Sequence, residues 1–140
     1  MEILWAPWRM GYVSQEREEG CFLCRKAAET EDERNLILAR WDKWFALLNT
    51  FPYNNGHTLI APYRHVGECE ELDEQEILGI GEGLNRVLRA LKAVLRPDGF
   101  NVGLNLGEAA GRERRSICTF TWFLAGGRTP TSCLRWEPQK

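Results

Sequence analysis

Residues 73–96 form the longest regular pattern in this chain of 140 residues, and the pattern is that of an amphipathic helix. Asp73 occupies an N-cap position and Glu76 follows three residues later, the spacing of a capping box. Apolar residues then recur every three or four positions, at Ile77, Ile80, Leu84, Val87, Leu88, Leu91, Val94 and Leu95. The segment Arg96-Pro97-Asp98-Gly99 ends the pattern. A single long helix of this kind needs an apolar surface to cover.

Two other features of the helical segment carry expectations. Gly79, Gly81 and Gly83 interrupt its first turns at a cost of up to about 1 kcal/mol each relative to Ala, and they are expected to permit close packing on a sheet. The acidic residues between Glu68 and Glu76 are interpreted as a solvated face and a helix start.

Short runs of β-forming residues surround the helix. Residues 36–40 and 44–49 are separated by three residues that suit a hairpin, and turn formers at 51–56 lead into a third run at 57–62. Residues 100–106 follow the helix as another predicted strand. We therefore expect an α+β fold, a mostly antiparallel sheet with one long helix packed on it.

The formal net charge of −2 hides a change in composition near Gly111. Residues 1–111 contain 12 basic and 18 acidic residues, whereas residues 112–140 contain 6 and 2 and show no helical period. The small net charge argues against nucleic acid as the main partner. No apolar run approaches the roughly 18 residues that span a bilayer, and the residues after Met1 lack the pattern of a signal peptide. We expect a cytoplasmic protein that does not contact membranes.

Cysteine and histidine are the residues with the clearest chemical potential. Cys21 and Cys24 have the Cys-x-x-Cys spacing that binds one tetrahedral Zn²⁺, although two small buried residues would give the same pattern. His57 and His65 are the only histidines, and an extended strand between them would hold them about 25 Å apart. His65 is then available as a third zinc ligand and His57 for a separate pocket. Satisfied polar residues at strand ends remain the alternative for both.

A glycine-rich segment, residues 103–111, follows the last predicted strand. Backbone N–H groups in such a loop can approach a phosphate because no Cβ stands in the way, but loops of this kind are common. Phe51 and Tyr53 lie close to Asn49 and could line a base pocket, although aromatic residues beside a strand more often belong to the core.

Four stretches, in this order, resemble the histidine triad (HIT) family: LWAPWR at 4–9, CFLC at 21–24, LLNTFPYNNGHTLIAPYRHV at 47–66 and DGFNVGLNLGEAAG at 98–111. The resemblance is strongest to the bacterial diadenosine tetraphosphate phosphorylases or hydrolases, and it covers residues 1–111 as one HIT-like domain. It implies a nucleotide-binding α+β fold, usually a homodimer. Members attack an α-phosphate with a histidine, form a nucleotidyl-histidine intermediate and release the nucleotide to water or phosphate.

The resemblance also implies roles for individual residues. Asn49 matches the family's contact to the ribose, His57 its outlying pocket histidine, and Asn105 the amide on the phosphate side. Phe51, Gly107 and Gly111 complete the expected nucleotide-binding set. Three of the four zinc ligands found in some members are matched by Cys21, Cys24 and His65.

The family's His-x-His-x-His motif, expected just after Gly111, is absent. In a shifted reading frame, each new codon consists of the third base of one residue's codon and the first two bases of the next. Codons for histidine then become possible at three places two residues apart: Ser116-Ile117, Cys118-Thr119 and Phe120-Thr121. Residues 128–134 decode in the same way to Asp-Thr-Asn-Phe-Met-Pro, another string of the family. We therefore predict that residues 112–140 are the family's own C-terminus read in a shifted frame. By propensity, residues 117–123 can still form the final strand.

Three functions follow from this sequence. The first is a nucleotidyl hydrolase or phosphorylase whose printed tail is faulty, and the second is a nucleotide-binding protein without turnover. The third is a small module stabilised by zinc. The first is favoured for the gene and the second for the polypeptide, because no residue in the matching position replaces the histidine nucleophile.

Overall fold

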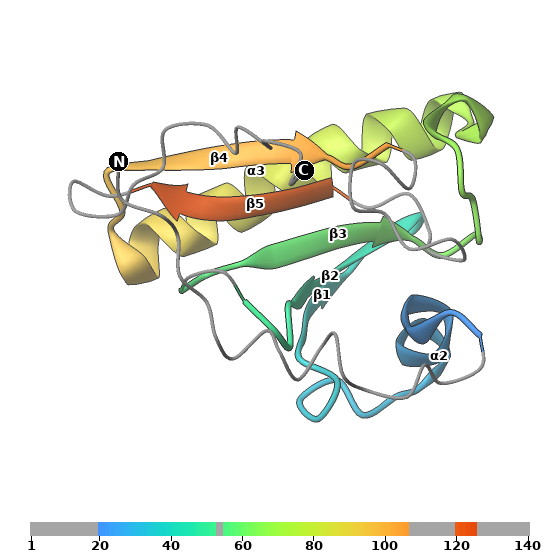
Figure 1. Cartoon of the computed structure of the whole chain (residues 1–140), viewed down its shortest axis with the longest axis horizontal. Coiled ribbons are helices and arrows are strands. Elements are labelled where there is room, and N and C mark those ends of the chain that lie inside the picture. Colours follow the sequence, from blue (N-terminus) through green and yellow to red (C-terminus); the bar gives the residue numbers. More distant parts are fainter. Residues whose placement is uncertain (1–19, 53–54, 107–119, 126–140) are drawn as a thin grey trace, which may run out of the picture.

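The computed structural model describes residues 20–52, 55–106 and 120–125, and these form a five-stranded antiparallel sheet flanked by two helices (Figure 1). The strands are β1 (Ile37–Arg40), β2 (Trp44–Leu48), β3 (Thr58–Pro62), β4 (Gly99–Leu104) and β5 (Phe120–Ala125). Their order is β1-β2-β3-β5-β4. The helices are α2 (Phe22–Ala28), α3 (Glu74–Leu95) and the short 3₁₀ turn η2 (Cys69–Glu71). The predicted α+β fold is confirmed.

The predicted hairpin and third strand are confirmed with small changes of bounds. β1 pairs with β2 around residues 41–43, and the β2–β3 register places Leu48 opposite Thr58. β4 ends at Leu104, so residues 105 and 106 lie outside the strand that was predicted to reach them. β5 lies between β3 and β4 and pairs with both. A strand is therefore present in the tail at 120–125, two residues past the predicted end at 123, and residues 117–119 lie outside the described ranges.

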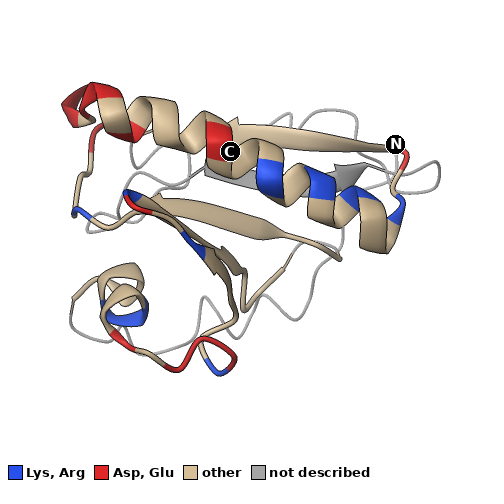
Figure 2. Cartoon of the chain, turned by 180° about the vertical axis from the view of Figure 1, so that it is seen from behind, with Lys and Arg blue, Asp and Glu red and all other residues tan. Residues whose placement is uncertain are grey.

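Helix α3 begins with the predicted capping box. The Asp73 carboxylate accepts the Glu76 N–H at 2.7 Å, and the Glu76 carboxylate accepts the Asp73 N–H at 2.9 Å. The helix ends at Arg96, whose backbone is left-handed with φ 46°. Acidic side chains gather in its first turns and basic side chains in its second half (Figure 2), which matches the polarity of the helix dipole.

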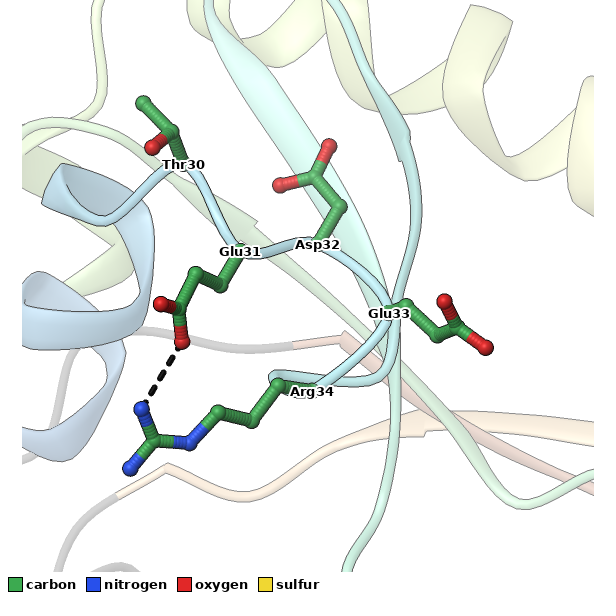
Figure 3. Close-up of a pocket in the computed structure, with 5 residues that line it drawn as sticks. All are labelled: Thr30, Glu31, Asp32, Glu33 and Arg34. Carbon is green, nitrogen blue, oxygen red and sulfur yellow. Dashed lines mark hydrogen bonds and ion pairs between the residues drawn. The ribbon is translucent and has the colours of Figure 1, made fainter.

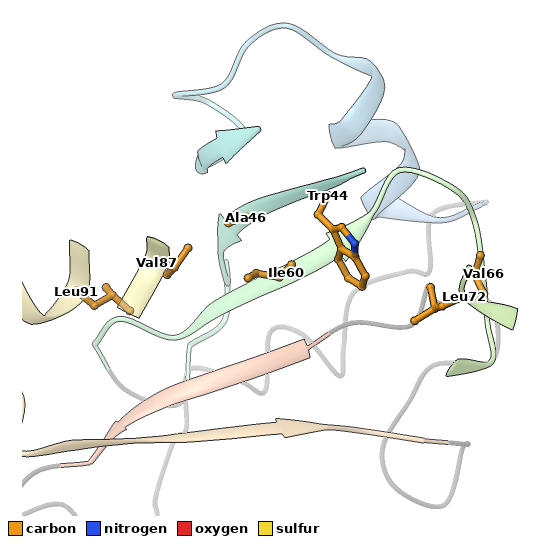
Figure 4. Packing of buried hydrophobic residues seen from close by; sticks show 7 residues of the cluster. All are labelled: Trp44, Ala46, Ile60, Val66, Leu72, Val87 and Leu91. Atoms are coloured by element: carbon orange, nitrogen blue, oxygen red, sulfur yellow. The ribbon is translucent and has the colours of Figure 1, made fainter. Parts of the chain in front are cut away.

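Two hydrophobic clusters lie on the two faces of the sheet. The first contains Trp44, Ala46, Ile60, Val66, Leu72, Val87 and Leu91, and joins α3 to β2 and β3 (Figure 4). The second joins α2 to the opposite face through Leu23, Phe45, Leu47, Leu59 and Ala61. Successive residues of β2 alternate between the clusters because side chains of a strand point to alternate faces. The candidate site residues described below lie near the two ends of β3, some of them on α2 and at the end of β2.

The apolar stripe of α3 is longer than the surface that covers it. Val87 and Leu91 are buried as predicted, whereas Ile77, Val94 and Leu95 at the two ends of the stripe are exposed. The acidic run also departs from its interpretation, since Glu76 is only 3% exposed. No helix in the described ranges is both long and apolar enough to cross a bilayer.

Candidate functional site

Cys21, Cys24 and His65 come together beside the first turn of α2. Cys21 is the N-cap residue of this helix, Cys24 lies one turn later, and His65 follows β3. The Cys24 Sγ atom lies 3.2 Å from His65 Nδ1, and one potential ligand atom from each of the three residues lies within 4.8 Å of the others. The structure thus brings the three predicted zinc-binding residues close enough to bind one metal ion.

The donor set fits zinc. Zn–S and Zn–N bonds of about 2.3 and 2.0 Å in a tetrahedron place neighbouring ligand atoms roughly 3.5 Å apart, which is the scale of this cluster. Burial, together with the neighbouring Cys21, raises the pKa of the Cys24 thiol to about 11. The thiol is therefore protonated at neutral pH unless a cation stabilises the thiolate. Two cysteines and one histidine leave the fourth position to another ligand.

Asn49, Phe51 and His57 form a second cluster where β2 ends and β3 begins. The Phe51 backbone N–H donates to Asn49 Oδ1 at 2.9 Å, and Asn49 Nδ2 lies 3.2 Å from His57 Nε2. With Oδ1 accepting from the backbone, the amide nitrogen faces the ring and donates to Nε2. A ring that carries its proton on Nδ1 would accept this N–H at Nε2. The ring is 3% exposed.

The remaining predicted nucleotide-binding residues are not joined to this cluster by the described structure. Asn105 lies directly after β4 and is exposed. Gly107 and Gly111 lie outside the described residues, as does Tyr53, so the glycine-rich loop stays a prediction.

Lys26 is a residue of this region that the sequence analysis missed. Its Nζ donates to the backbone oxygen of Asn35 at 3.2 Å and to Thr50 Oγ1 at 3.5 Å, directly after Asn49. Partial burial lowers the pKa of the Lys26 ammonium. The helix α2 was not predicted, so no signal placed this lysine beside the end of β2.

The described part of the molecule has two further hollows, and the second borders the Asn49 cluster because Leu48 and Gly56 line it. An open one of about 570 Å³ is lined by Thr30, Glu31, Asp32, Glu33 and Arg34. Its carboxylates point in different directions, and one of them pairs with an arginine of the same turn (Figure 3), so they do not converge on a common ligand position. The other, of about 630 Å³, is a mainly apolar groove between β1 and the second half of α3. It lies on the α3 face of the sheet, opposite α2.

Comparisons with known proteins agree on one family. The sequence profile "HIT domain" matches residues 29–115. The "AP-4-A phosphorylase" of Mycobacterium tuberculosis is 39% identical over 119 residues, which cover 79% of this chain and 61% of that protein. The chain thus spans about three fifths of the length of that relative.

Solved structures show the same fold. A HIT family protein from Bacillus subtilis superimposes with a TM-score of 0.73 at 21% identity, covering 86% of this chain and 84% of that one. A Zn-bound histidine triad family protein from Mycobacterium smegmatis superimposes with a TM-score of 0.65 at 22% identity, covering 85% and 84%. With a profile match over more than half of its length and the fold of these proteins, the chain belongs to the HIT domain family.

Proposed function

We propose that this chain binds a nucleotide or dinucleoside polyphosphate at the cluster of Asn49, Phe51 and His57, with Asn105, Gly107 and Gly111 on the phosphate side. The observation that carries the proposal is the hydrogen-bonded series from the Phe51 N–H through the Asn49 amide to His57 Nε2. The series holds the amide in one orientation at a strand end, with one N–H and one lone pair left for a ligand hydroxyl. The named relative, an AP-4-A phosphorylase, supports diadenosine tetraphosphate as the substrate class.

We further propose that the printed polypeptide binds without turnover through a nucleotidyl-histidine. HIT enzymes need a histidine nucleophile, and only His57 and His65 exist here. His57 is buried with Nε2 against Asn49, and His65 turns Nδ1 toward Cys24. The gene, in contrast, encodes a phosphorylase or hydrolase once its frame is restored near Gly111.

We also propose that Cys21, Cys24 and His65 hold zinc in a structural role. Bound zinc would cross-link α2 to the segment that follows β3. The resemblance gives a homodimer, and β4, an edge strand with Val102 44% exposed, offers a surface for it. Thiols that bind metal fit a reducing compartment such as the cytoplasm.

Equilibrium dialysis of the full chain with adenosine monophosphate tests nucleotide binding. We expect saturable binding that Asn49→Ala weakens at least tenfold, or about 1.4 kcal/mol. Asn85→Ala, an exposed amide on α3, is the matched control and should bind like the parent chain. If the parent chain shows no binding, the proposal is wrong.

Turnover is tested separately. We expect the printed chain to leave diadenosine tetraphosphate intact with or without phosphate, and to form no acid-labile phosphoramide. Resequencing the gene from the codon of Asn105 to that of Leu134 should reveal one base gained or lost. Cleavage by the printed chain through a histidine intermediate would refute the assignment, since only His57 or His65 could supply it.

A further inference from the structure

Glu76 is a buried carboxylate at the start of α3. Its side chain is 4% exposed and accepts two hydrogen bonds from Arg64, at 3.0 Å from Nε and 2.6 Å from Nη2. The same carboxylate accepts the Asp73 N–H of the capping box. The Arg64 guanidinium holds the pKa of the Glu76 carboxyl below its usual range. A charge this buried requires its partner, because an unpaired carboxylate in the interior is costly.

The pair is anchored at further points. Trp44 Nε1 donates to the Glu76 carbonyl oxygen at 2.5 Å, and Trp44 itself is fully buried. Arg64 Nη2 also donates to the carbonyl oxygen of Glu71 at 2.7 Å. Arg64 thereby ties the segment after β3 to both η2 and the first turn of α3.

His65 lies between two fixed neighbours. Arg64 on one side is held by the fork to Glu76, and Val66 on the other side is 1% exposed in the core cluster. The imidazole itself is exposed and reaches Cys24, 41 residues earlier in the chain. The backbone on both sides of His65 is therefore held by contacts to α3 and to the first core cluster.

We propose that the Arg64–Glu76 pair is the positioning device of the metal centre, which fixes the backbone at His65 so that its imidazole stays within reach of Cys21 and Cys24. The inference rests on the proposed metal site. Groups that hydrogen-bond directly to a metal ligand typically change metal affinity 10- to 100-fold when they are removed, and we take this range as the scale for a pair that acts through the backbone of the ligand. Arg64 contacts no metal ligand with its side chain in the described structure and acts through the backbone it shares with His65.

A purely structural ion pair is the competing explanation, and α3 offers a control for it. Arg86 pairs with Glu82 one turn earlier on the same helix, and both side chains are more than half exposed. This pair is far in sequence from the metal residues and contacts none of them. Arg86→Ala therefore removes an arginine and an ion pair from α3 without touching the segment at His65.

Cobalt titration of the full, reduced, metal-free chain tests the proposal. Co²⁺ bound by two thiolates and an imidazole in a tetrahedral site gives intense visible d–d bands, which report geometry as well as affinity. We expect Arg64→Ala to weaken Co²⁺ binding 10- to 100-fold and to reduce the d–d bands. Arg64→Lys keeps the positive charge but loses the two-pronged hydrogen bonding of the guanidinium, so its Co²⁺ affinity should lie between those of Arg64→Ala and the parent chain. Arg86→Ala should bind Co²⁺ like the parent chain.

The outcomes separate the inference from the function on which it rests. If the parent chain gives no tetrahedral cobalt spectrum, the metal site is refuted and the inference with it. If the parent chain binds cobalt and Arg64→Ala binds it equally well with the same spectrum, the positioning role alone is refuted. Should Arg64→Ala fail to fold, Glu76→Gln keeps an acceptor for the Asp73 N–H and removes the charge. Parent-like cobalt binding by both Glu76→Gln and Arg64→Lys would then overturn the proposal.

Discussion

Three glycines at alternate positions of α3 should respond to alanine substitution in opposite directions. A Cβ built on Gly79 would lie 2.9 Å from Trp44 Cδ1 and 3.3 Å from Trp44 Nε1. Trp44 has no room to yield, since it is fully buried and its ring nitrogen donates to the Glu76 carbonyl oxygen. A Cβ on Gly81 would meet nothing within 4 Å, and one on Gly83 would make an ordinary contact of 3.5 Å with Ile60 Cδ1.

The magnitudes follow from two opposing contributions to the free energy of unfolding. Replacing Gly by Ala inside a helix stabilises by up to about 1 kcal/mol, and this contribution is common to all three positions. Overpacking at Gly79→Ala costs about 1–3 kcal/mol, so that variant should be neutral to about 2 kcal/mol less stable than the parent chain. Gly81→Ala and Gly83→Ala should gain up to about 1 kcal/mol.

Urea and thermal unfolding of the three variants measure the difference. For a chain of this size, 1 kcal/mol corresponds to a shift in Tm of about 2–4 °C, so Gly79→Ala and Gly81→Ala should differ by about 2–12 °C. The helix-propensity contribution is common to the three variants, so it cancels when their Tm values are compared. If Gly79→Ala proves as stable as Gly81→Ala, the close contact between α3 and Trp44 is not as described.

Three further predictions concern the surroundings of the site. Arg40 donates to the backbone oxygens of Ala27 and Glu29 at the end of α2, both at 2.8 Å. Arg40→Ala removes these donors and should lower the free energy of unfolding, measured in urea, by about 1–3 kcal/mol. An unfolding midpoint in urea equal to that of the parent chain would contradict this prediction. Because the pKa of Glu76 is lowered in the folded chain, its contribution is present above its ordinary pKa and is lost as the pH falls through the folded value. The free energy of unfolding should therefore fall less steeply on the acid side for Glu76→Gln, and an unchanged slope would argue against the pairing of the buried Glu76 carboxylate with Arg64. A chelator should lower the Tm of the zinc-loaded parent chain and leave the Tm of Cys24→Ser unchanged. With free zinc at 100 times Kd before chelation, the loss corresponds to about 2.7 kcal/mol. Equal shifts in Tm for the two chains would exclude Cys24 as a ligand.

The long helix and the first three strands could be predicted because their signals are local. The capping box fixes the start of α3 from residues three apart, and hairpin spacing fixes the order of β1, β2 and β3. Helix α2 lacked such a signal, since its N-cap side chain makes no capping hydrogen bond. Its stability comes from distant contacts, the burial of Leu23 and the hydrogen bonds from Arg40.

The sequence predicted that Cys21, Cys24 and His65 come together, but it did not predict Lys26 or the hydrogen bond between Asn49 and His57. The contact between His65 and Cys24 spans 41 residues and depends on how α2 packs against the sheet. The hydrogen bond between Asn49 and His57 follows from the β2–β3 register, one step beyond the pair Leu48 and Thr58. Glu76 was misjudged as solvated because its partner, Arg64, lies before the acidic run and reaches it only in the folded chain. The division of the chain near Gly111 stays a prediction.

The pairing of β5 with β3 and β4 bears on the predicted shift of the reading frame near Gly111. A β-ladder is made by peptide groups, which every residue except proline carries in full, so strand pairing places few demands on which side chains follow one another. A catalytic motif on the same strand makes the opposite demand, because each of its side chains is irreplaceable. A slip of the reading frame into β-prone codons can therefore erase an enzyme's reactivity in one step and preserve the architecture that binds its ligand. If the predicted shift is real and the proposed ligand binds, the folded product would sequester that ligand without turning it over.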